Sequence, residues 1–187
     1  MRVIAGKHGG RKLRTLRGLA LRPTSDALRE TLFNILGSMA VESIFIDVFA
    51  GSGAVGLEAL SRGASEVFFI EKHAPAAEVI RQNLSSLGIA SGAEVISADA
   101  LRGLEILAAR HLLADLIYLD PPYEKEGEYL RVLEFLDASR LVAPRGWVIA
   151  EHTRRRELPD RFEHLERVRL HEQGDASLSF YHLALAA

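Results

Sequence analysis

The stretch from Ser43 to Gly63 constrains the fold of this chain more than any other part of the sequence. It reads SIFIDVFAGSGAVGLEALSRG, an apolar β-branched run followed by glycines and then by helix-favouring residues. This order predicts a strand, a tight turn and a helix. Gly51, Gly53 and Gly56 let the backbone turn sharply and approach a ligand closely. The helix behind them points unpaired backbone N–H groups into the turn.

Asp47 bears on which ligand this turn would take. The pattern Gly51-x-Gly53-x-x-Gly56 fits the pyrophosphate of a dinucleotide as written. A pyrophosphate would meet an extra negative charge at Asp47, whereas that carboxylate can neutralise the ammonium and sulfonium charges of S-adenosylmethionine (SAM). A turn with no ligand stays possible, because a glycine pattern alone is weak evidence. The residues therefore favour SAM without deciding the question.

The composition is that of a soluble globular protein. The chain has 187 residues, enough for one domain with a core, and 48% of them are hydrophobic. No apolar run is long enough to span a membrane, and the opening MRVIAGKHGG lacks the apolar core of a signal peptide. We therefore expect a cytoplasmic location and no membrane partner.

The sequence contains no cysteine. This excludes disulfides, thiolate zinc sites and cysteine nucleophiles, and with them pyrimidine carbon-5 methylation through a covalent cysteine adduct. We expect no metal site.

Basic residues gather at the start of the chain, although its formal net charge is −2. Residues 1–29 hold eight Lys or Arg against one acid, which suggests a polyanion partner. Gly9-Gly10 predicts a hairpin within residues 1–21. We interpret this segment as an arm that tracks RNA phosphates, with a solvated surface as the alternative. The expected RNA contacts are Arg2, Lys7, Arg11, Lys12, Arg14 and Arg22.

A helix is expected within residues 22–37. Pro23, Thr24 and the two residues after them predict its start, and Gly37 predicts its end. Its apolar face, at helical spacing, consists of Leu28, Leu32, Ile35 and Leu36. The start of the helix could form a lid over a neighbouring ligand or could only cap the helix.

The rest of the chain, residues 38–187, alternates between strand and helix patterns. Strands are expected over 43–49, 66–70, 93–97, 114–119 and 146–150, and helices over 74–87, 101–109 and 129–136. Segments 162–170 and 176–185 predict an antiparallel pair joined around Gly174-Asp175. The predicted fold class is therefore α/β, a Rossmann-like and mostly parallel sheet with an antiparallel C-terminal strand. We expect one domain over residues 1–187.

Acidic residues follow the second and third expected strands. Glu71 lies 20 residues after Gly51, about where an acid hydrogen-bonds a ribose diol in nucleoside-binding α/β folds. Asp99 could accept the exocyclic amine of adenine, could cap the helix that follows, or could do both.

The fourth expected strand ends in Asp120-Pro121-Pro122-Tyr123. Consecutive prolines hold a stiff backbone, and although they also make plain turns, the end of a buried strand is where such sheets bind ligands. The loop suits methyl transfer to an exocyclic amine. The Asp120 carboxylate and the Pro121 carbonyl could each accept one N–H, so that the nitrogen lone pair points outward. Tyr123 would stack on a base turned out of its helix or loop.

Several segments along nearly the whole chain carry a family resemblance. They are Arg2 to Gly6, GRKL at 10–13, LRPTSDALRETLFNIL, DVFAGSGAVGLEALSRGA, LDPPY, and the tail with Gly174 and Tyr181. Together they resemble the RsmD family, which methylates N2 of one guanine in small-subunit (16S) ribosomal RNA. The RPTSDALRETLFN block is the specific signal, because many methyltransferases have the glycine motif and the DPPY motif. The family often has Phe where this chain has Tyr123, and either ring can stack.

The resemblance implies a class I SAM-dependent methyltransferase whose basic arm engages RNA and whose helix from Thr24 closes over the cofactor. It implies that SAM is the cofactor and that small-subunit rRNA is the partner. Because the chain has no obvious separate recognition domain, we expect the RNA to be presented within a ribosomal precursor particle, and we expect a monomeric enzyme. The expected SAM contacts are Asp47, Phe49, Gly51, Ser52, Gly53, Glu71, Lys72, Asp99, Ala100 and Thr24. The expected catalytic residues are Asp120, Pro121, Pro122 and Tyr123.

Three other functions stay open. An adenine-N6 methyltransferase could use the same four-residue loop, although the chain is short for an enzyme that reads DNA sequence. A nicotinamide-dependent oxidoreductase could use the glycine pattern, but would leave Asp47 and the loop at Asp120 without a role. A non-catalytic RNA-binding module would leave that loop unexplained.

Overall fold

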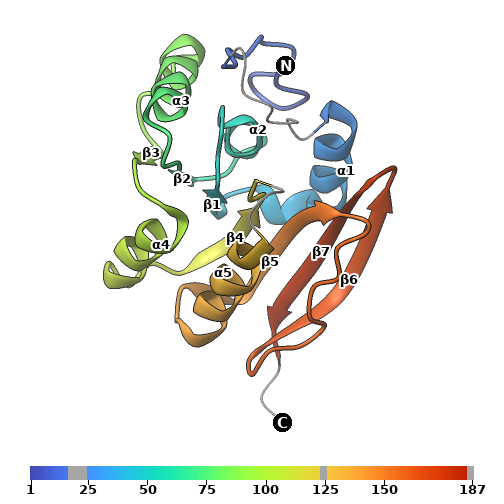
Figure 1. Ribbon diagram of the computed structural model, residues 1–187. Helices are drawn as coiled ribbons and strands as arrows, with labels where there is room; N and C mark the ends of the chain where they lie inside the picture. Colours follow the sequence, from blue (N-terminus) through green and yellow to red (C-terminus); the bar gives the residue numbers. More distant parts are fainter. Residues whose placement is uncertain (17–24, 123–125, 185–187) are drawn as a thin grey trace.

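The computed structural model describes residues 1–16, 25–122 and 126–184, and Figure 1 shows them arranged around one sheet. The strands are β1 (Ile44–Val48), β2 (Glu66–Ile70), β3 (Ala93–Ile96), β4 (Ala114–Leu119), β5 (Val142–Thr153), β6 (Leu165–Gln173) and β7 (Ala176–Leu183). The helices are α1 (Asp26–Leu36), α2 (Ala54–Ser61), α3 (Ala74–Leu87), α4 (Ala100–Ala109) and α5 (Glu126–Ala138), with a short 3-10 helix η1 (Gly37–Ala40) after α1.

The sheet has the strand order β3-β2-β1-β4-β5-β7-β6. Strands β1 to β5 pair in parallel, whereas β7 is antiparallel to both β5 and β6. The predicted α/β class and the antiparallel C-terminal pair are therefore confirmed. The direction of winding reverses between β1 and β4, where Val48 lies opposite Leu119. Open α/β sheets bind their ligands at such a switch point, outside the carboxyl ends of the strands.

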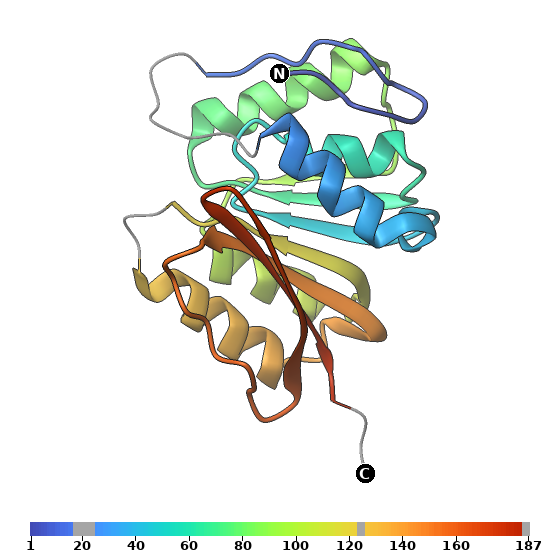
Figure 2. The same cartoon turned by 90° about the vertical axis from the view of Figure 1, so that its right-hand side faces the viewer.

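Helices cover both faces of the sheet, as Figure 2 shows. Helices α1, α2 and α3 pack on one face, and α4 and α5 pack on the other. Alternate residues of β1 face the two layers, since Phe45 belongs to one core and Ile46 to the other. Among the described residues, no helix combines the length and the apolar character that a membrane crossing needs.

Most element boundaries follow the local signals in the sequence. Helix α3 occupies the predicted span and ends at Gly88, which adopts the left-handed conformation. Helix α1 begins after Ser25, whose hydroxyl caps it by accepting the Leu28 N–H. The predicted start of this helix at Thr24, and the whole of residues 17–24, lie outside the described residues.

One predicted strand begins later than expected. Strand β6 starts at Leu165 rather than at 162, because the Asp137 carboxylate accepts backbone N–H groups from Glu163 and His164. The same carboxylate also accepts the N–H of Leu165, at 2.6 Å. A side chain distant in sequence therefore takes the donors that a longer strand would use.

Candidate functional site

A cavity of about 520 Å³ opens at the carboxyl ends of β1, β2 and β4. Its volume lies within the range of small-molecule sites, which is roughly 300–1,000 Å³. The wall consists of the glycine turn after β1, the end of β2, the start of α4, the loop after β4 and part of the N-terminal segment. The predicted site residues in this wall are Asp47, Phe49, Gly51, Ser52, Glu71, Lys72, Ala100, Asp120 and Pro122.

The glycine turn is a strained backbone segment that is tied to β2. Phe49, Gly51 and Gly53 all have positive φ angles, of 64°, 56° and 78°. For a bulky residue such as Phe49 this conformation costs roughly 1–3 kcal/mol and persists only where the surroundings enforce it. The Ala50 N–H donates to the Ile70 carbonyl at 3.1 Å, which ties the turn to β2.

The glycines of the turn serve different purposes. A Cβ on Gly56 would lie 2.4 Å from Cε1 of Phe69 and 2.8 Å from Cγ1 of Val67, so this glycine lets α2 pack closely on β2. A Cβ on Gly53 would meet Ile80 at 3.1 Å, and Gly53 does not line the cavity. Gly51 lines the cavity, and a Cβ there would meet no protein atom of the described residues within 4 Å. Of the three glycines, Gly51 is thus the one whose backbone a ligand in the cavity could approach closely.

Asp47 has a buried carboxyl group and lines the cavity. Its side chain is 2% exposed, and Oδ2 accepts the Gly56 N–H at 2.8 Å. Burial raises the pKa of Asp47 from 3.8 to about 8, the hydrogen bond from Gly56 opposes this, and the nearby Glu71 carboxylate adds to it. A cation bound beside Asp47 would favour its ionised form.

The Glu71 carboxylate accepts hydrogen bonds from two backbone N–H groups at and near the glycine turn. Its Oε2 accepts the Gly51 N–H at 2.8 Å, and its Oε1 accepts the His73 N–H at 2.7 Å. An ionised carboxylate has about four acceptor positions, so these two bonds leave room for hydroxyl donors from a ligand.

Asp99 is exposed and caps α4. Its Oδ1 accepts the Arg102 N–H at 3.2 Å, whereas its neighbours Ala98 and Ala100 line the cavity. The sequence allowed Asp99 to bind the adenine amine, to cap the helix, or to do both. The structure shows the cap.

The loop after β4 lies beside the glycine turn. The backbone N–H of Asp120 approaches the carbonyl of Val48, at 3.5 Å, and Asp120 and Pro122 line the cavity. Pro121 is buried beside them, and Tyr123 lies outside the described residues. Asp120 and Pro122 therefore line the same cavity as the glycine turn, across the β1–β4 boundary.

Beneath this loop lies a hydrogen-bonded pair that sequence reasoning missed. Tyr118 lines the cavity and donates its hydroxyl to the buried carboxylate of Glu151. The backbone carbonyl of Glu151 accepts the Tyr129 hydroxyl at 2.7 Å. Glu151 therefore contacts both β4, which leads into the loop, and α5, which follows it.

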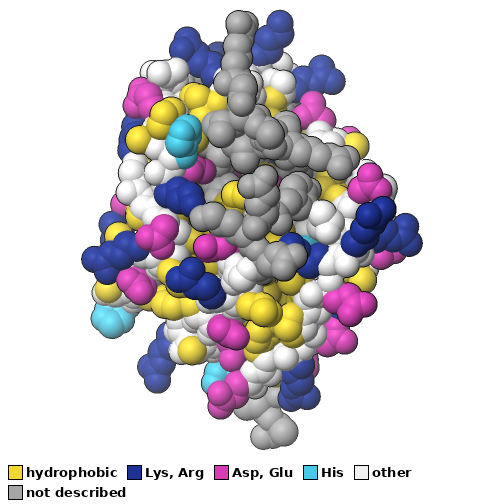
Figure 3. All heavy atoms as spheres, viewed as in Figure 1, with side chains coloured by type: hydrophobic (Ala, Val, Ile, Leu, Met, Phe, Trp, Pro, Cys, Tyr) yellow, Lys and Arg dark blue, Asp and Glu magenta, His cyan; other side chains and the backbone are white. Residues whose placement is uncertain are grey.

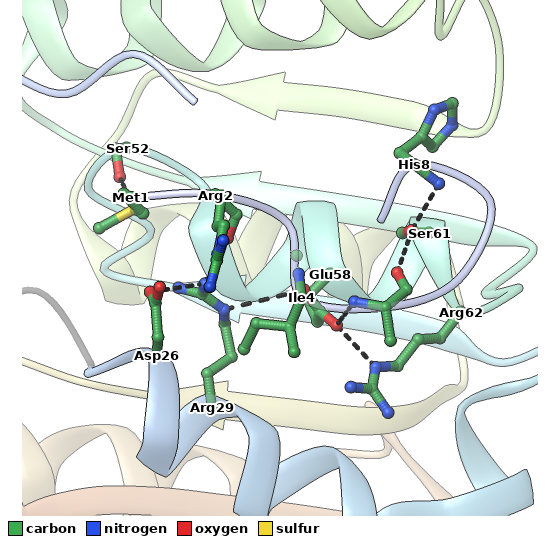
Figure 4. Close-up of polar contacts among 12 residues, drawn as sticks. Met1, Arg2, Ile4, His8, Asp26, Arg29, Ser52, Glu58, Ser61 and Arg62 are labelled. Carbon is green, nitrogen blue, oxygen red and sulfur yellow. Dashed lines mark hydrogen bonds and ion pairs between the residues drawn. The ribbon is translucent and has the colours of Figure 1, made fainter. Parts of the chain in front are cut away.

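The N-terminal segment supplies another wall of the cavity, through Met1, Thr15 and Leu16. Figure 4 shows how its first part is held on α2: the buried Glu58 carboxylate accepts the N–H groups of Ile4 and Ala5, at 2.7 and 3.0 Å. The sequence carried a signal for this contact, because Glu58 is an acid within a helix whose other residues are all uncharged.

A second anchor lies further along the N-terminal segment. Asn83 of α3 is fully buried, and its Oδ1 accepts the Arg14 N–H at 2.8 Å. Its Nδ2 donates to the carbonyls of Arg14 and Ser52, both at 3.1 Å. Asn83 thus joins the N-terminal segment to the glycine turn, a role with no local signal in the sequence.

The predicted RNA contacts are spread along the outside of α2 and α3. The Lys7 N–H donates to the Ser61 carbonyl at the end of α2, and Arg11 Nη2 donates to the Ser86 carbonyl near the end of α3. Both helices begin at the cavity, so Lys7 and Arg11 lie at the opposite end. Arg2 and Lys12 form the antiparallel bridge of the predicted hairpin, Arg14 contacts Gln82, and Arg22 lies outside the described residues.

Residues 1–182 of the chain match the family model described as conserved hypothetical protein 95. YlbH of Bacillus subtilis (strain 168) is 36% identical over 181 residues, which cover 97% of this chain and 98% of YlbH. Ribosomal RNA small subunit methyltransferase D of Escherichia coli (strain K12) is 36% identical over 151 residues, which cover 81% of this chain and 71% of that protein.

Solved structures share the fold. The yhhF protein of Escherichia coli superposes with a TM-score of 0.85 at 32% identity, over 98% of this chain and 97% of that one. An RNA methyltransferase of Salinibacter ruber in complex with S-adenosyl-L-homocysteine has a TM-score of 0.64 at 14% identity, over 88% and 95% of the two chains. At that identity the likeness concerns the fold alone.

Proposed function

The chain belongs to the RsmD family of methyltransferases, and from this premise we propose that it methylates the exocyclic N2 amine of a guanine in small-subunit ribosomal RNA with SAM as cofactor. The observation that supports this most is the cavity at the β1–β4 boundary, with the glycine turn on one side and Asp120 on the other. A ribosomal precursor particle as substrate and a cytoplasmic, monomeric enzyme belong to the same proposal.

The donors at the glycine turn fit SAM better than a dinucleotide. A pyrophosphate needs the free N–H groups of such a turn. Here the Gly51 N–H donates to Glu71 and the Gly56 N–H donates to Asp47, so two carboxylates already hold these positions. The Glu71 carboxylate would repel a phosphate, whereas the positive charge of SAM would be attracted to Glu71 and would favour the ionised form of Asp47.

Several groups in the cavity would hold the cofactor. Glu71 would accept ribose hydroxyls, and the Gly51 backbone would lie against the ligand. The other contacts in this proposal are Asp47, Phe49, Ser52, Lys72, Asp99, Ala100 and Thr24, whereas Gly53 would support the turn from outside the cavity lining. When bound, SAM supplies an electrophilic methyl group on a sulfonium.

The loop at Asp120 would prepare the amine for transfer. An exocyclic amine is a poor nucleophile, because its lone pair is delocalised into the ring. The Asp120 carboxylate and the Pro121 carbonyl would accept its two N–H groups and direct the lone pair toward the cofactor side of the cavity. The gain comes from orientation and from preorganised acceptors, and Tyr123 would stack on the base.

The test is transfer of a tritiated methyl group from SAM to bare small-subunit rRNA and, in parallel, to its precursor particle. Nucleoside analysis should find the label as N2-methylguanosine. Label on adenine N6 would instead support the rival methyltransferase. An absence of label on both substrates would contradict the proposal.

The first variant to examine is Asp120→Ala. Loss of one preorganised polar group typically lowers kcat by about 10²–10³-fold, and we expect a loss at least this large. The affinity for SAM, measured by calorimetry, should stay within a few-fold because Asp120 belongs to the amine side of the cavity. Unchanged turnover would refute the role of Asp120.

A further inference from the structure

A run of three arginines, Arg154–Arg156, follows β5 on the cavity side of the sheet. Leu119, the last residue of β4, pairs with Ala150, but β5 continues to Thr153. At about 3.3 Å per residue, the end of β5 stands roughly 10 Å beyond the end of β4. The three arginines therefore lie further out along the strand direction than the start of the loop at Asp120.

The backbone of this arginine loop is held in place. The Arg154 N–H donates to the Asp175 carbonyl in the β6–β7 turn at 2.9 Å. The Arg156 N–H donates to the Thr153 carbonyl at 2.9 Å and closes a turn. The loop is thus an ordered turn whose position depends on the end of the sheet.

One arginine of the loop packs against the helix that follows the catalytic loop. The Arg156 guanidinium lies over the Tyr129 ring, 5.1 Å from its centroid, a cation–π distance. Tyr129 lies in the first turn of α5 and bonds to the carbonyl of Glu151. Arg156 therefore fixes the arginine loop relative to the segment that carries Asp120.

The other two guanidinium groups face solvent. Arg154 is exposed and pairs with Glu172 at 2.9 Å, and its side chain is 61% accessible. Arg155 is exposed and, within the described part of the chain, makes no side-chain hydrogen bond or ion pair. Figure 3 shows Lys and Arg mixed with Asp and Glu over the visible face, so position rather than overall charge distinguishes this pair.

We infer that Arg154 and Arg155 form a phosphate-binding surface for the RNA strand next to the target nucleotide, with Arg156 on Tyr129 as its anchor. A nucleotide whose base reaches Asp120 must leave its ribose and phosphates outside the cavity, at the level of this loop. The planar guanidinium binds phosphate oxygens in pairs. This inference rests on the proposed function, and it locates the RNA strand at the end of β5 rather than at Lys7 and Arg11.

The test compares two double variants with the same change in charge. Arg154→Gln with Arg155→Gln removes the proposed surface, and Arg140→Gln with Arg145→Gln removes two exposed arginines near the amino end of β5. Methylation of the RNA is measured against RNA concentration from about 50 to 200 mM salt. Circular dichroism melting and SAM calorimetry show that each variant is folded and loaded.

For the Arg154 and Arg155 variant we expect KM for the RNA to rise at least 10-fold at the higher salt. For a single strand, each phosphate contact contributes about 0.7 to the slope of log K against log salt. Removing two contacts should therefore lower this slope by about 1.4. The effect should appear in KM rather than in kcat. The Arg140 and Arg145 variant should match the parent.

The alternatives are distinguishable. If the parent methylates RNA but the Arg154 and Arg155 variant keeps its KM and salt slope, the inference is wrong and the proposed function stands. A slope that falls only in a Lys7→Gln, Arg11→Gln variant would also overturn the inference, in favour of the N-terminal segment. A parent that methylates neither substrate would contradict the proposed function itself.

Discussion

At the scale of single residues, two carboxylates organise the glycine turn by accepting its backbone N–H groups. Asp47 holds Gly56 and Glu71 holds Gly51, so the turn is formed before any ligand arrives. This preorganisation has a cost, because Asp47 is buried and its pKa is raised to about 8. The burial of Asp47 thereby lowers the free energy of unfolding at a position that lines the cavity, as is common at binding sites.

The raised pKa of Asp47 makes stability depend on pH. Below 3.8 the carboxyl is protonated in both the folded and the unfolded chain; between 3.8 and about 8 the unfolded chain loses this proton while the folded chain keeps it. The free energy of unfolding should therefore fall as pH rises through this window and level off above it. Asp47→Asn keeps an acceptor for Gly56 but removes the ionisation, so it should remove this contribution.

Urea denaturation at about pH 5 and pH 8 measures the effect. Relative to the parent, Asp47→Asn should be more stable at the higher pH than at the lower. The variant should also bind SAM less tightly, because it lacks a negative charge beside the cavity. An equal stability difference at both values of pH would contradict the assignment.

Gly56 tests the packing role of a glycine. In Gly56→Ala the added methyl would overlap Phe69 and Val67, at 2.4 and 2.8 Å, and overpacking of this kind costs typically about 1–3 kcal/mol. Gly127→Ala in α5 is the control, since a Cβ there meets no atom of the described residues within 4 Å and should cause no loss. Denaturant midpoints measure both changes, and equal midpoints would contradict the packing role.

At the scale of elements, the N-terminal segment is part of the site wall because buried polar groups hold it. The Glu58 carboxylate accepts Ile4 and Ala5, and it also binds Arg62 Nε at 2.7 Å and lies 3.9 Å from Nε of the buried Arg29 (Figure 4). One side chain of α2 thus joins the segment, α2 and α1.

Glu58→Gln should therefore loosen the segment and destabilise the protein. Removing one partner of a buried ion pair costs about 3–5 kcal/mol, because the other charge stays buried. Hydrogen exchange should speed up at the amides of Ile4 and Ala5, and SAM affinity should fall. Glu105→Gln is the control: Glu105 pairs with Arg102 at side-chain exposures of 51% and 66%, and such a pair contributes about 0–1 kcal/mol. Similar losses in both variants would contradict the role of Glu58.

At the scale of the whole molecule, the cavity draws on segments from the start of the chain to the end of β4. A ligand that binds them all in the folded state should stabilise the fold. S-adenosyl-L-homocysteine at 100 times its Kd should add about 2.7 kcal/mol and raise Tm by roughly 5–10 °C for a chain of this size. NADH at the same concentration is the control and should leave Tm unchanged; a shift with NADH alone would favour an oxidoreductase.

Local patterns predicted much of the fold. The strand, turn and helix around Gly51, the span of α3 and the antiparallel C-terminal pair all follow from spacing and turn residues, which act over a few positions. Glu71 could be picked out because its distance from the turn is set by one helix and one strand. These features are determined by neighbours in sequence, so the sequence alone was sufficient for them.

Only the tertiary structure decided which distant residues share the cavity. The sequence predicts the basic start of the chain as an RNA arm, which stays a prediction, and it gives no sign that this segment also lines the cavity. Val3 and Leu13 are buried in the core, and Asn83 and Glu58 accept backbone N–H groups of the segment. Met1 and Leu16 consequently reach the cavity, whereas Lys7 lies at the end of α2 that is away from the cavity. Packing between elements likewise decides which glycine of the turn contacts protein and which faces the cavity, and it brings Glu151 to Tyr118 near Asp120. Such contacts leave no fixed spacing in the sequence.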